Sequence, residues 1–351
     1  MKILILCPPF DRIGGVSNLY KSSSKFFTLD VDYFFTGNYL KKDLFSSLFK
    51  FVKDILIFRD KIKNESYSLI SLNPSLDIKA IFRDFLFLLI SKRFNKRVVF
   101  FIHGWDKTLE KIIEKYFKKI FISLLNKCEL VVVLAKEFKD KLLSWGCTSN
   151  IELITTAVDD DLLLGFDIKS KPINNHLLFL SRIKKEKGIR IAVDAVDILS
   201  KTHNLVLRVV GDGPYLEDIQ RYVSSNNIKN VVFCGNLTGK KKSLEFINSC
   251  IYVFPTSYGE GMPTTVLEAM AFGLPIITRR VGGLKDFFED GKMGYITESK
   301  DPSVFAKLLK SLLDNPTKIK EMGEYNHAYA KEHLLASKVA KKMEEIYLSI
   351  V

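Results

Sequence analysis

Two series of short apolar segments, separated by longer amphipathic stretches, constrain the fold of this chain more than any other feature. Ile, Val and Phe are frequent in these segments, which is typical of buried strands. Strands that alternate with helices form parallel sheets covered by helices. The sequence therefore predicts an α/β protein with two parallel sheets. The first series lies near 2–7, 31–35, 68–72, 97–102 and 130–134, and the second near 176–181, 205–210, 231–234, 251–254 and 275–278.

The two series predict two domains of similar construction. A chain of 351 residues exceeds what one hydrophobic core usually supports. Between the series, the segment from Asp159 to Pro172 is polar and has no clear period. We therefore expect a first domain over 1–168 and a second over 169–335. Residues 336–351 read as a final helix, which could pack back on the first domain.

The cysteines and the net charge indicate the cellular compartment and the possible partners of the protein. Its five cysteines are dispersed and form no C-x-x-C pair, so a disulfide framework or a zinc site is not expected and a reducing cytoplasm is favoured. The net charge is +13, and residues 41–120 hold 18 Lys/Arg against 9 Asp/Glu. This surplus suits an anionic membrane surface, a phosphorylated substrate or nucleic acid, or it is a solvated surface without a partner. No basic motif interleaved with aromatic residues supports nucleic acid.

The most informative motif runs from Tyr258 to Pro275. Thr264 or Thr265 is expected to open a helix after a strand and a loop, and the free backbone N–H groups of a helix start bind phosphate. Glu260 in the loop and Glu268 in the first turns of the helix offer carboxylates to the hydroxyls of a sugar or a ribose. The alternative is a helix-capping loop with solvated glutamates.

This motif resembles the E-x7-E signature of the retaining glycosyltransferases of family four. The family has the GT-B fold, in which two Rossmann-like domains with parallel sheets face a cleft. The resemblance implies that Glu260 contacts the hydroxyls of the donor sugar and Glu268 the ribose. The rest of the motif is assigned to the donor site as well, namely Gly261, Met262, Pro263, Thr264, Thr265 and Val266.

A second element, Leu180 to Gly188, follows the first strand of the second domain, where a doubly wound fold binds its ligands. It resembles the R-x4-K-G element of the family, which implies that Arg182 and Lys187 neutralise the leaving diphosphate. The turn Gly211-Asp-Gly-Pro214 matches the G-x-G-P turn of the family and places Gly211 beside the diphosphate. Asn236 follows the next strand, where the family seats the base. Three further cations are interpreted as surface charge: Lys184, Lys185 and Arg208.

The first domain contributes two candidates. Gly14 and Gly15 follow the first strand and can present backbone amides to an anion. No G-x-G-x-x-G occurs there, which argues against a dinucleotide dehydrogenase. His103 ends an apolar strand and matches the H-G element of the family, which implies a place near the reacting sugar. A lone histidine is otherwise most often structural.

One loop departs from the family pattern. The family often has Asn-Gly-Val-Asp before the domain boundary, whereas this chain has Thr156-Ala-Val-Asp159. The acidic run Asp159-Asp160-Asp161 belongs to this loop and not to a strand end, so we predict no metal site. No cofactor is expected besides the nucleoside diphosphate sugar, which is a substrate.

The resemblance spans residues 14 to about 275 and implies a metal-independent hexosyltransferase that retains the anomeric configuration. We expect a UDP-sugar as donor and a saccharide as acceptor, lipid-linked, in the synthesis of a cell-surface polysaccharide. A nucleotide-sugar epimerase and a non-catalytic sugar-nucleotide-binding protein are the alternatives. The basic residues would hold a cytoplasmic enzyme peripherally on the inner face of the cell membrane. The cluster comprises Lys92-Arg93, Lys96-Arg97, Lys111, Lys115 and Lys118-Lys119.

Overall fold

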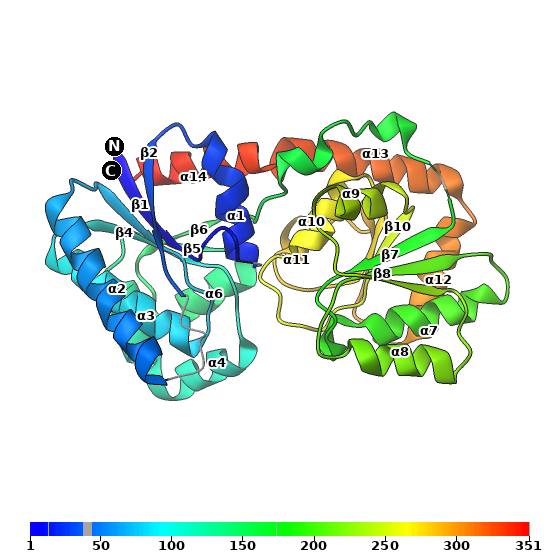
Figure 1. Cartoon of the computed structure of the whole chain (residues 1–351), viewed down its shortest axis with the longest axis horizontal. Coiled ribbons are helices and arrows are strands. Elements are labelled where there is room, and N and C mark those ends of the chain that lie inside the picture. Colours follow the sequence, from blue (N-terminus) through cyan, green and yellow to red (C-terminus); the bar gives the residue numbers. More distant parts are fainter. Residues whose placement is uncertain (13, 38–43, 173, 351) are drawn as a thin grey trace. The chain divides into compact units, whose positions relative to one another are not determined.

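A computed structural model describes residues 1–12, 14–37, 44–172 and 174–350 (Figure 1). The chain divides into two compact units. Unit 1 comprises Met1–Ala157, Gly259–Met262 and Ala336–Val351, and unit 2 comprises Val158–Tyr258 and Pro263–Leu335.

The division near Ala157 differs from the boundary expected at 168. The intervening segment packs with unit 2, because the Val158 N–H donates to the carbonyl oxygen of Leu334 at 2.8 Å. The ring of Phe166 also lies 5.1 Å from that of Phe272, measured between centroids. The polar composition of this segment therefore marks a loop on the surface of unit 2 more than a linker.

Unit 1 contains a six-stranded, wholly parallel sheet with the order β2-β1-β3-β4-β5-β6. Strand β1 pairs with β2 and β3, so the first strand of the chain is central, as in a Rossmann-like half. The strands are β1 (Lys2–Cys7), β2 (Asp30–Phe35), β3 (Leu69–Leu72), β4 (Arg97–Ile102), β5 (Leu130–Val133) and β6 (Asn150–Leu153).

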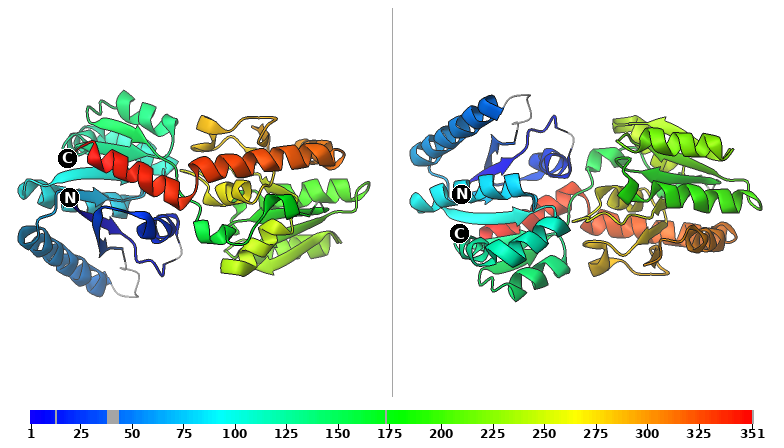
Figure 2. Two further views of the ribbon diagram at one scale, coloured as in Figure 1. Left: turned by 90° about the horizontal axis from the view of Figure 1, so that it is seen from above. Right: turned by 90° about the horizontal axis from the view of Figure 1, so that it is seen from below.

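Alternate residues of these strands enter two separate cores, because successive side chains of a strand point to opposite faces. On one face, Ile3, Val99 and Phe101 pack with helices α1 (Gly15–Ser23) and α14 (Ala336–Leu348). In both views of Figure 2, α14, drawn in red, lies along the sheet of unit 1. The other face is covered by α2 (Leu44–Asn64), α3 (Ile78–Arg93), α5 (Lys118–Leu125) and α6 (Lys136–Ser144).

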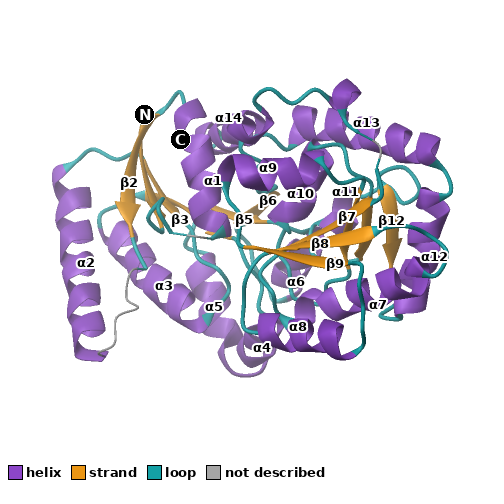
Figure 3. Cartoon of the chain, turned by 45° about the vertical axis from the view of Figure 1, so that its right-hand side comes forward, coloured by secondary structure: helices purple, strands orange, loops and turns teal. Residues whose placement is uncertain are grey.

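Unit 2 repeats the design with the strand order β12-β11-β10-β7-β8-β9, again parallel throughout (Figure 3). Its strands are β7 (His176–Leu180), β8 (Val206–Val210), β9 (Val231–Gly235), β10 (Ile251–Phe254), β11 (Ile276–Arg279) and β12 (Gly294–Thr297). One face carries α7 (Ile189–Ser200), α8 (Leu216–Ser225) and α12 (Pro302–Leu313); the other carries α9 (Gly239–Ile247), α10 (Thr264–Ala271) and α13 (Pro316–His333).

The predicted α/β fold with two parallel sheets is confirmed, and each sheet has one strand more than the sequence indicated. The additional strands, β6 and β12, both lie at a sheet edge. Each has four residues, of which only one is buried: Ile151 in β6 and Gly294 in β12. An edge strand with a single buried residue lacks the run of apolar residues from which a strand is predicted.

Within the described ranges, no helix is both long and apolar enough to cross a membrane.

Candidate functional site

The loops after β7, β8 and β9 meet at the carboxyl edge of the unit 2 sheet. The Ile183 N–H donates to the Asp212 carbonyl at 2.9 Å, and the Gly211 N–H donates to the Gly235 carbonyl at 2.8 Å. This edge is where doubly wound sheets bind their ligands. The backbone thus brings together the segments that carry Arg182, Gly211 and Asn236.

Gly211 is required by the packing of these loops. Its φ is +134°, and a Cβ atom built there would lie 1.9 Å from the carbonyl oxygen of Ser181. No other residue fits such a contact. The glycine therefore fixes the loop geometry, and its place beside a diphosphate stays a prediction.

The two predicted cations differ in their surroundings. Arg182 is exposed and forms no ion pair with a described residue. Lys187 is half-buried, with its Nζ 4.5 Å from the ring centroid of Tyr258. The Nζ of Lys184 lies 5.0 Å from the same ring, so Lys184 is not simply surface charge as expected. The ring of Tyr258 thus lies near two ammonium groups, which the face of an aromatic ring attracts.

Helix α10 begins directly after Pro263. By their position in the first turn, the N–H groups of Thr264 and Thr265 have no carbonyl to bind within the helix. The Thr265 hydroxyl lies 2.8 Å from that of Tyr252 and so points to the sheet. Val266 is wholly buried and its N–H donates to the Pro263 carbonyl, so packing accounts for Val266, which was assigned to the donor site.

Glu268 is a buried carboxylate of unit 2, with 5% of its surface exposed. Its Oε1 lies 2.7 Å from the Nζ of Lys242. Its Oε2 is also buried and accepts no hydrogen bond from a described residue. A buried carboxylate oxygen without a donor costs free energy, which the hydroxyl of a ligand would recover.

In unit 1, His103 follows β4 and is held by Asn73, which follows β3. The Asn73 amide nitrogen donates to the carbonyls of Leu6 and Ser71 at 3.0 and 3.1 Å, which fixes its orientation. Its Oδ1 therefore faces the His103 Nε2 at 3.0 Å and also accepts from the Tyr20 hydroxyl. Since Oδ1 only accepts, the Nε2 of His103 carries the proton and its Nδ1 is an acceptor.

Burial lowers the pKa of His103 to about 3. Its ring lies 3.7 Å from that of Phe101, measured between centroids. This apolar contact disfavours the charged form, so the imidazole is neutral at physiological pH. His103 is therefore suited to donate and accept hydrogen bonds and not to act as a cation.

The loop Gly259–Met262 belongs to unit 1 together with His103. A Cβ atom built at Gly261 would lie 2.5 Å from the carbonyl oxygen of His103, so only glycine permits this approach. Met262 packs against the core that faces α1 and α14. Glu260, in the same loop, is half-buried, and its assignment with His103 to the donor sugar stays a prediction.

Gly14 and Gly15 stand at the start of α1. In contrast to Gly211, a side chain would fit at both, because a Cβ atom at Gly15 meets no described atom within 4 Å. Packing does not account for these glycines, and their role in binding an anion stays a prediction.

The residues that hold His103 and Glu268 were not predicted from the sequence. Asn73 lies in Leu-Asn-Pro directly after a strand, and a polar residue at a carboxyl strand end is a signal that could have found it. Lys242 gave no such signal, because it is the last of three consecutive lysines. Arg208, interpreted as surface charge, is in fact half-buried and donates from Nη2 to Glu245 Oε1 at 2.7 Å.

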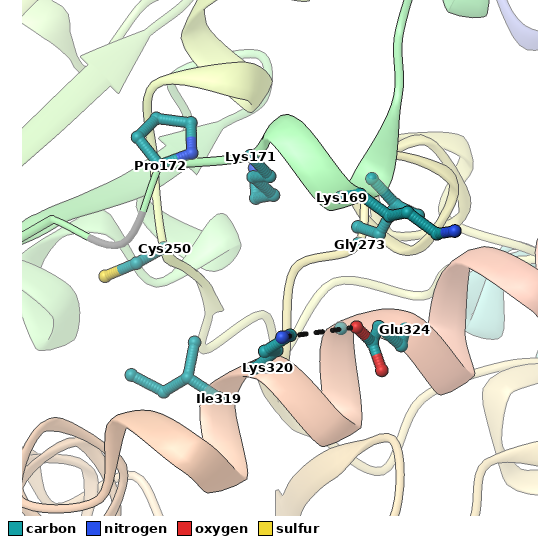
Figure 4. A pocket seen from close by; sticks show the side chains of 10 residues that line it. Lys169, Lys171, Pro172, Cys250, Gly273, Ile319, Lys320 and Glu324 are labelled. Atoms are coloured by element: carbon teal, nitrogen blue, oxygen red, sulfur yellow. Dashed lines mark ion pairs between the residues drawn. The ribbon is translucent and has the colours of Figure 1, made fainter.

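A cavity of about 190 Å³ lies elsewhere in unit 2, beside the short turn η4 (Ile168–Ser170) and α13 (Figure 4). Cys250 and Gly273, which line it, precede β10 and β11 and so mark the amino edge of the sheet. Lys171 donates to the carbonyls of Phe246 and Ile247 at 2.6 and 3.1 Å and thereby caps the end of α9. Burial lowers the pKa of Lys171 to about 7. None of the predicted site residues lines this cavity.

The acidic run after β6 has a local role. The Asp159 side chain accepts from the Asp161 N–H at 3.2 Å and caps the turn η3 (Asp160–Leu163). In the parts of the chain that the structure describes, no group of three or more His, Cys, Asp or Glu is arranged to hold a metal ion.

Two Rossmann-like units with parallel sheets are the features of the GT-B fold, and the ligand-binding edge of the second unit carries cations and a buried carboxylate. Residues 166–329 match the family "Glycosyl transferases group 1", and residues 52–162 match "Glycosyltransferase Family 4". The chain belongs to these GT-B glycosyltransferases.

Relatives agree with this assignment. The chain is 26% identical over 236 residues to an uncharacterized glycosyltransferase of Methanocaldococcus jannaschii, an alignment that covers 66% of the chain and 62% of the relative. It is also 26% identical over 218 residues to the capsular polysaccharide biosynthesis glycosyltransferase CapM of Staphylococcus aureus, covering 61% of the chain and 56% of the relative. The matched region thus spans less than two thirds of the length of these curated relatives.

Solved structures share the fold. The Anabaena protein HepE in complex with UDP-glucose has a TM-score of 0.74 at 16% identity, with 99% of this chain and 100% of that chain covered. Sucrose-phosphate synthase from Thermosynechococcus elongatus has a TM-score of 0.77 at 17% identity, with 99% and 98% covered. At this identity the likeness establishes the fold alone.

Proposed function

We propose that the protein transfers a hexosyl unit from a UDP-sugar to a hydroxyl of a saccharide acceptor, with retention of the anomeric configuration. The observation that carries the proposal is the buried Glu268, whose Oε2 accepts no hydrogen bond from a described residue. It lies on the helix that follows the ligand-binding edge of the sheet, in the unit that also supplies Arg182 and Lys187. The uridine nucleotide is favoured because HepE, which shares the fold, was solved with UDP-glucose.

The proposed reaction exchanges one bond for another at the anomeric carbon. The bond from this carbon to the diphosphate oxygen breaks, and the acceptor oxygen bonds to it on the same face of the sugar. The acceptor proton passes to the departing diphosphate oxygen. Arg182, Lys187 and the N-terminus of α10 stabilise the charge that develops on the diphosphate, which is the main catalytic contribution. No metal ion takes part in the proposal.

His103 and Glu260 are proposed to hold the sugar. The neutral imidazole presents the acceptor Nδ1, because Asn73 occupies its Nε2–H. Glu260 accepts hydrogen bonds from sugar hydroxyls. Together they discriminate hydroxyl positions while adding no positive charge beside the developing oxocarbenium-like centre.

The test is a panel of UDP-, GDP- and ADP-sugars examined by ligand-detected NMR. We expect binding of at least one UDP-sugar and weaker binding of its GDP and ADP counterparts. With an acceptor, NMR of the first product should show the anomeric configuration of the donor. An isomerised sugar formed without acceptor would favour the epimerase, and binding without any turnover would favour the non-catalytic binding protein.

We further propose that the acceptor is lipid-linked and that the protein works peripherally on the cytoplasmic face of the cell membrane, in cell-surface polysaccharide synthesis. Relatives named for colanic acid and capsular polysaccharide biosynthesis support the pathway class. The membrane component rests on the exposed surface of unit 1.

The exposed apolar residues of that surface lie on α3, on η2 and on α5. Phe85 and Phe87 of α3 are buried in the core, whereas Phe82 is 63% exposed. At the π-helical turn η2 (Ile113–Phe117) and the start of α5, Tyr116 and Ile120 are each 64% exposed. Interfacial aromatic residues flanked by lysines are typical of membrane-surface helices. The flanking lysines are Lys111, Lys115, Lys118 and Lys119, all exposed.

Three members of the predicted basic cluster are engaged within the protein. The Lys96 Nζ donates to the carbonyl of Tyr67 at 3.2 Å, and the Arg97 Nη1 donates to that of Ile350 at 2.7 Å. The Lys92 Nζ lies 2.6 Å from the Glu129 Oε2, so this charge is already paired. The binding surface is therefore centred on η2 and α5, where each exposed lysine near the surface contributes about 1 kcal/mol to attraction by anionic lipid.

Sedimentation with vesicles tests this component. Binding to anionic but not zwitterionic vesicles is expected, weakening steeply with salt because screening shortens the range of the charges. Lys118→Glu/Lys119→Glu should abolish it, whereas the matched charge change Lys201→Glu/Lys229→Glu on exposed sites of unit 2 should not. Equal binding to both lipid types, or none at low salt, contradicts the membrane component and favours a soluble acceptor.

A further inference from the structure

Helix α9 is anchored at several points to the body of unit 2. Glu245 pairs with Arg208 of β8, and the end of the helix is capped by Lys171. The Ser243 hydroxyl donates to the carbonyl of Leu162 at 3.3 Å. These contacts leave the helix little freedom to shift or rotate. A side chain that projects from its first turn therefore starts from a fixed point.

Three consecutive lysines occupy this first turn, and the structure distinguishes them. Lys240 and Lys241 are exposed, whereas the Lys242 side chain is only 18% exposed and contacts Glu268 at 2.7 Å. The Glu268 side chain is 7% exposed. A lysine this enclosed, bonded to a carboxylate this buried, is more ordered than a surface ion pair, whose net contribution is small.

The two carboxylate oxygens of Glu268 have different surroundings. Oε1 accepts from Lys242, and Oε2 is buried with no donor among the described residues. An ammonium group bound to one oxygen restricts rotation of the carboxylate about its terminal bond. The other oxygen is thereby presented in one direction, where a donor from outside the protein can satisfy it.

We propose that Lys242 is a positioning residue for the nucleotide. It holds Glu268 by Oε1 so that Oε2 accepts a hydrogen bond from one ribose hydroxyl, and this makes the site selective for ribonucleotides over deoxyribonucleotides. The inference rests on the proposed function, in which Glu268 contacts the ribose. It adds the residue that orients the carboxylate and the discrimination that follows.

A selectivity ratio separates this role from two simpler ones. Loss of the lysine charge alone would weaken binding of every nucleoside diphosphate by the same factor, since all carry the same diphosphate. Loss of stability alone would lower the melting temperature and leave the ratio unchanged. Loss of positioning reduces the preference for UDP over its deoxy analogue, because only UDP carries the hydroxyl that Oε2 would bind.

The experiment is calorimetric titration with UDP, 2′-deoxy-UDP and 3′-deoxy-UDP. A hydrogen bond to a charged acceptor corresponds to a preference of roughly 10- to 100-fold, so the wild-type protein should bind one deoxy analogue at least about 10-fold more weakly than UDP. Lys242→Met retains the apolar stem and should reduce this preference to about 3-fold or less. Lys242→Arg should restore part of it, and Lys241→Met, the exposed neighbour, should leave it unchanged. Circular dichroism and thermal melting confirm that each variant is folded.

Glu268→Gln distinguishes the proposed ribose contact from the proposed role of Lys242. If the wild-type protein binds none of the three ligands, or if Glu268→Gln keeps the full preference, the proposed ribose contact itself fails. If Glu268→Gln removes the preference and Lys242→Met keeps it, the ribose contact stands and the role of Lys242 is refuted. Equal weakening of UDP and both analogues in Lys242→Met likewise refutes positioning and leaves a general charge effect.

Discussion

Replacing the two cations of the donor site tests the catalytic proposal most directly. Arg182→Ala and Lys187→Ala each remove a charged donor from the loop that follows β7. Removing one preorganised donor from a developing oxyanion typically reduces turnover by about 10²- to 10³-fold, or roughly 2.7–4 kcal/mol. We expect losses of this size in kcat with each variant. Arg182→Lys should recover little, because lysine lacks the planar fork that binds two phosphate oxygens.

The structure predicts different effects on stability. Arg182 is exposed and has no ion pair with a described residue, so its removal should change the free energy of unfolding by about 0.5 kcal/mol or less. Lys187 lies against the ring of Tyr258, a contact worth about 0.5–1 kcal/mol at a partly exposed site. Its loss should lower the melting temperature by a few degrees at most. The large effect on turnover therefore cannot arise from unfolding.

The assay is kcat with a UDP-sugar and an acceptor, with circular dichroism as the check on folding. Lys185→Ala is the matched control, since Lys185 is an exposed cation of the same loop. Turnover near the wild-type value in both Arg182→Ala and Lys187→Ala would refute the assignment. A loss in Lys185→Ala as large as in the other two would show that only the overall charge of the loop matters.

Three further predictions concern the carboxylates, metal ions and His103. Glu260→Ala should reduce kcat and sugar selectivity while UDP binding persists, and Glu268→Ala should mainly weaken UDP binding. If calorimetry shows the same loss of UDP affinity in both variants, the assignment of one carboxylate to the sugar and the other to the ribose is contradicted. Activity should persist in excess EDTA, because cationic side chains are assigned the role that magnesium has elsewhere; abolition with rescue by a divalent ion would reverse this view. Because the pKa of His103 is lowered to about 3 in the folded protein and is about 6.5 in an unfolded chain, the unfolded state binds the extra proton between these values. The free energy of unfolding should therefore fall as pH falls from about 6.5 toward 3. In urea titrations, His103→Gln should reduce this dependence of the free energy of unfolding on pH. An unchanged dependence on pH in the variant would contradict a neutral His103.

The fold was predictable because its main signals are local. Central strands such as Val131–Val133 are buried on both faces, so they appear in the sequence as continuous apolar runs. The edge strands β6 and β12 bury one residue each and produce no run. The position of Val158 in unit 2 depends on its hydrogen bond to Leu334, far along the chain, which no local pattern encodes.

For the candidate site too, local features could be predicted and contacts with distant residues could not. The positions of Arg182 and His103 could be predicted from the sequence, because Arg182 lies two residues after β7 and His103 directly follows β4. In each parallel sheet, the carboxyl ends of the strands lie at the edge that binds ligands. The residues that hold His103 and Glu268 could not be predicted from the sequence. His103 is held by a residue 30 positions away and Glu268 by one 26 positions away, and each pairing depends on where another strand or helix is anchored.

A motif residue such as Glu268 carries two oxygens of equal chemistry, and the sequence cannot tell which of them is left for a ligand. In the proposal that choice is made by Lys242, which α9 positions beside Glu268, and α9 is itself held by Arg208 and Lys171. The direction in which the carboxylate accepts a hydrogen bond is therefore set by residues outside every recognisable motif. Selectivity within a family that shares its motifs can thus change by substitution of such supporting residues while the motif itself stays the same.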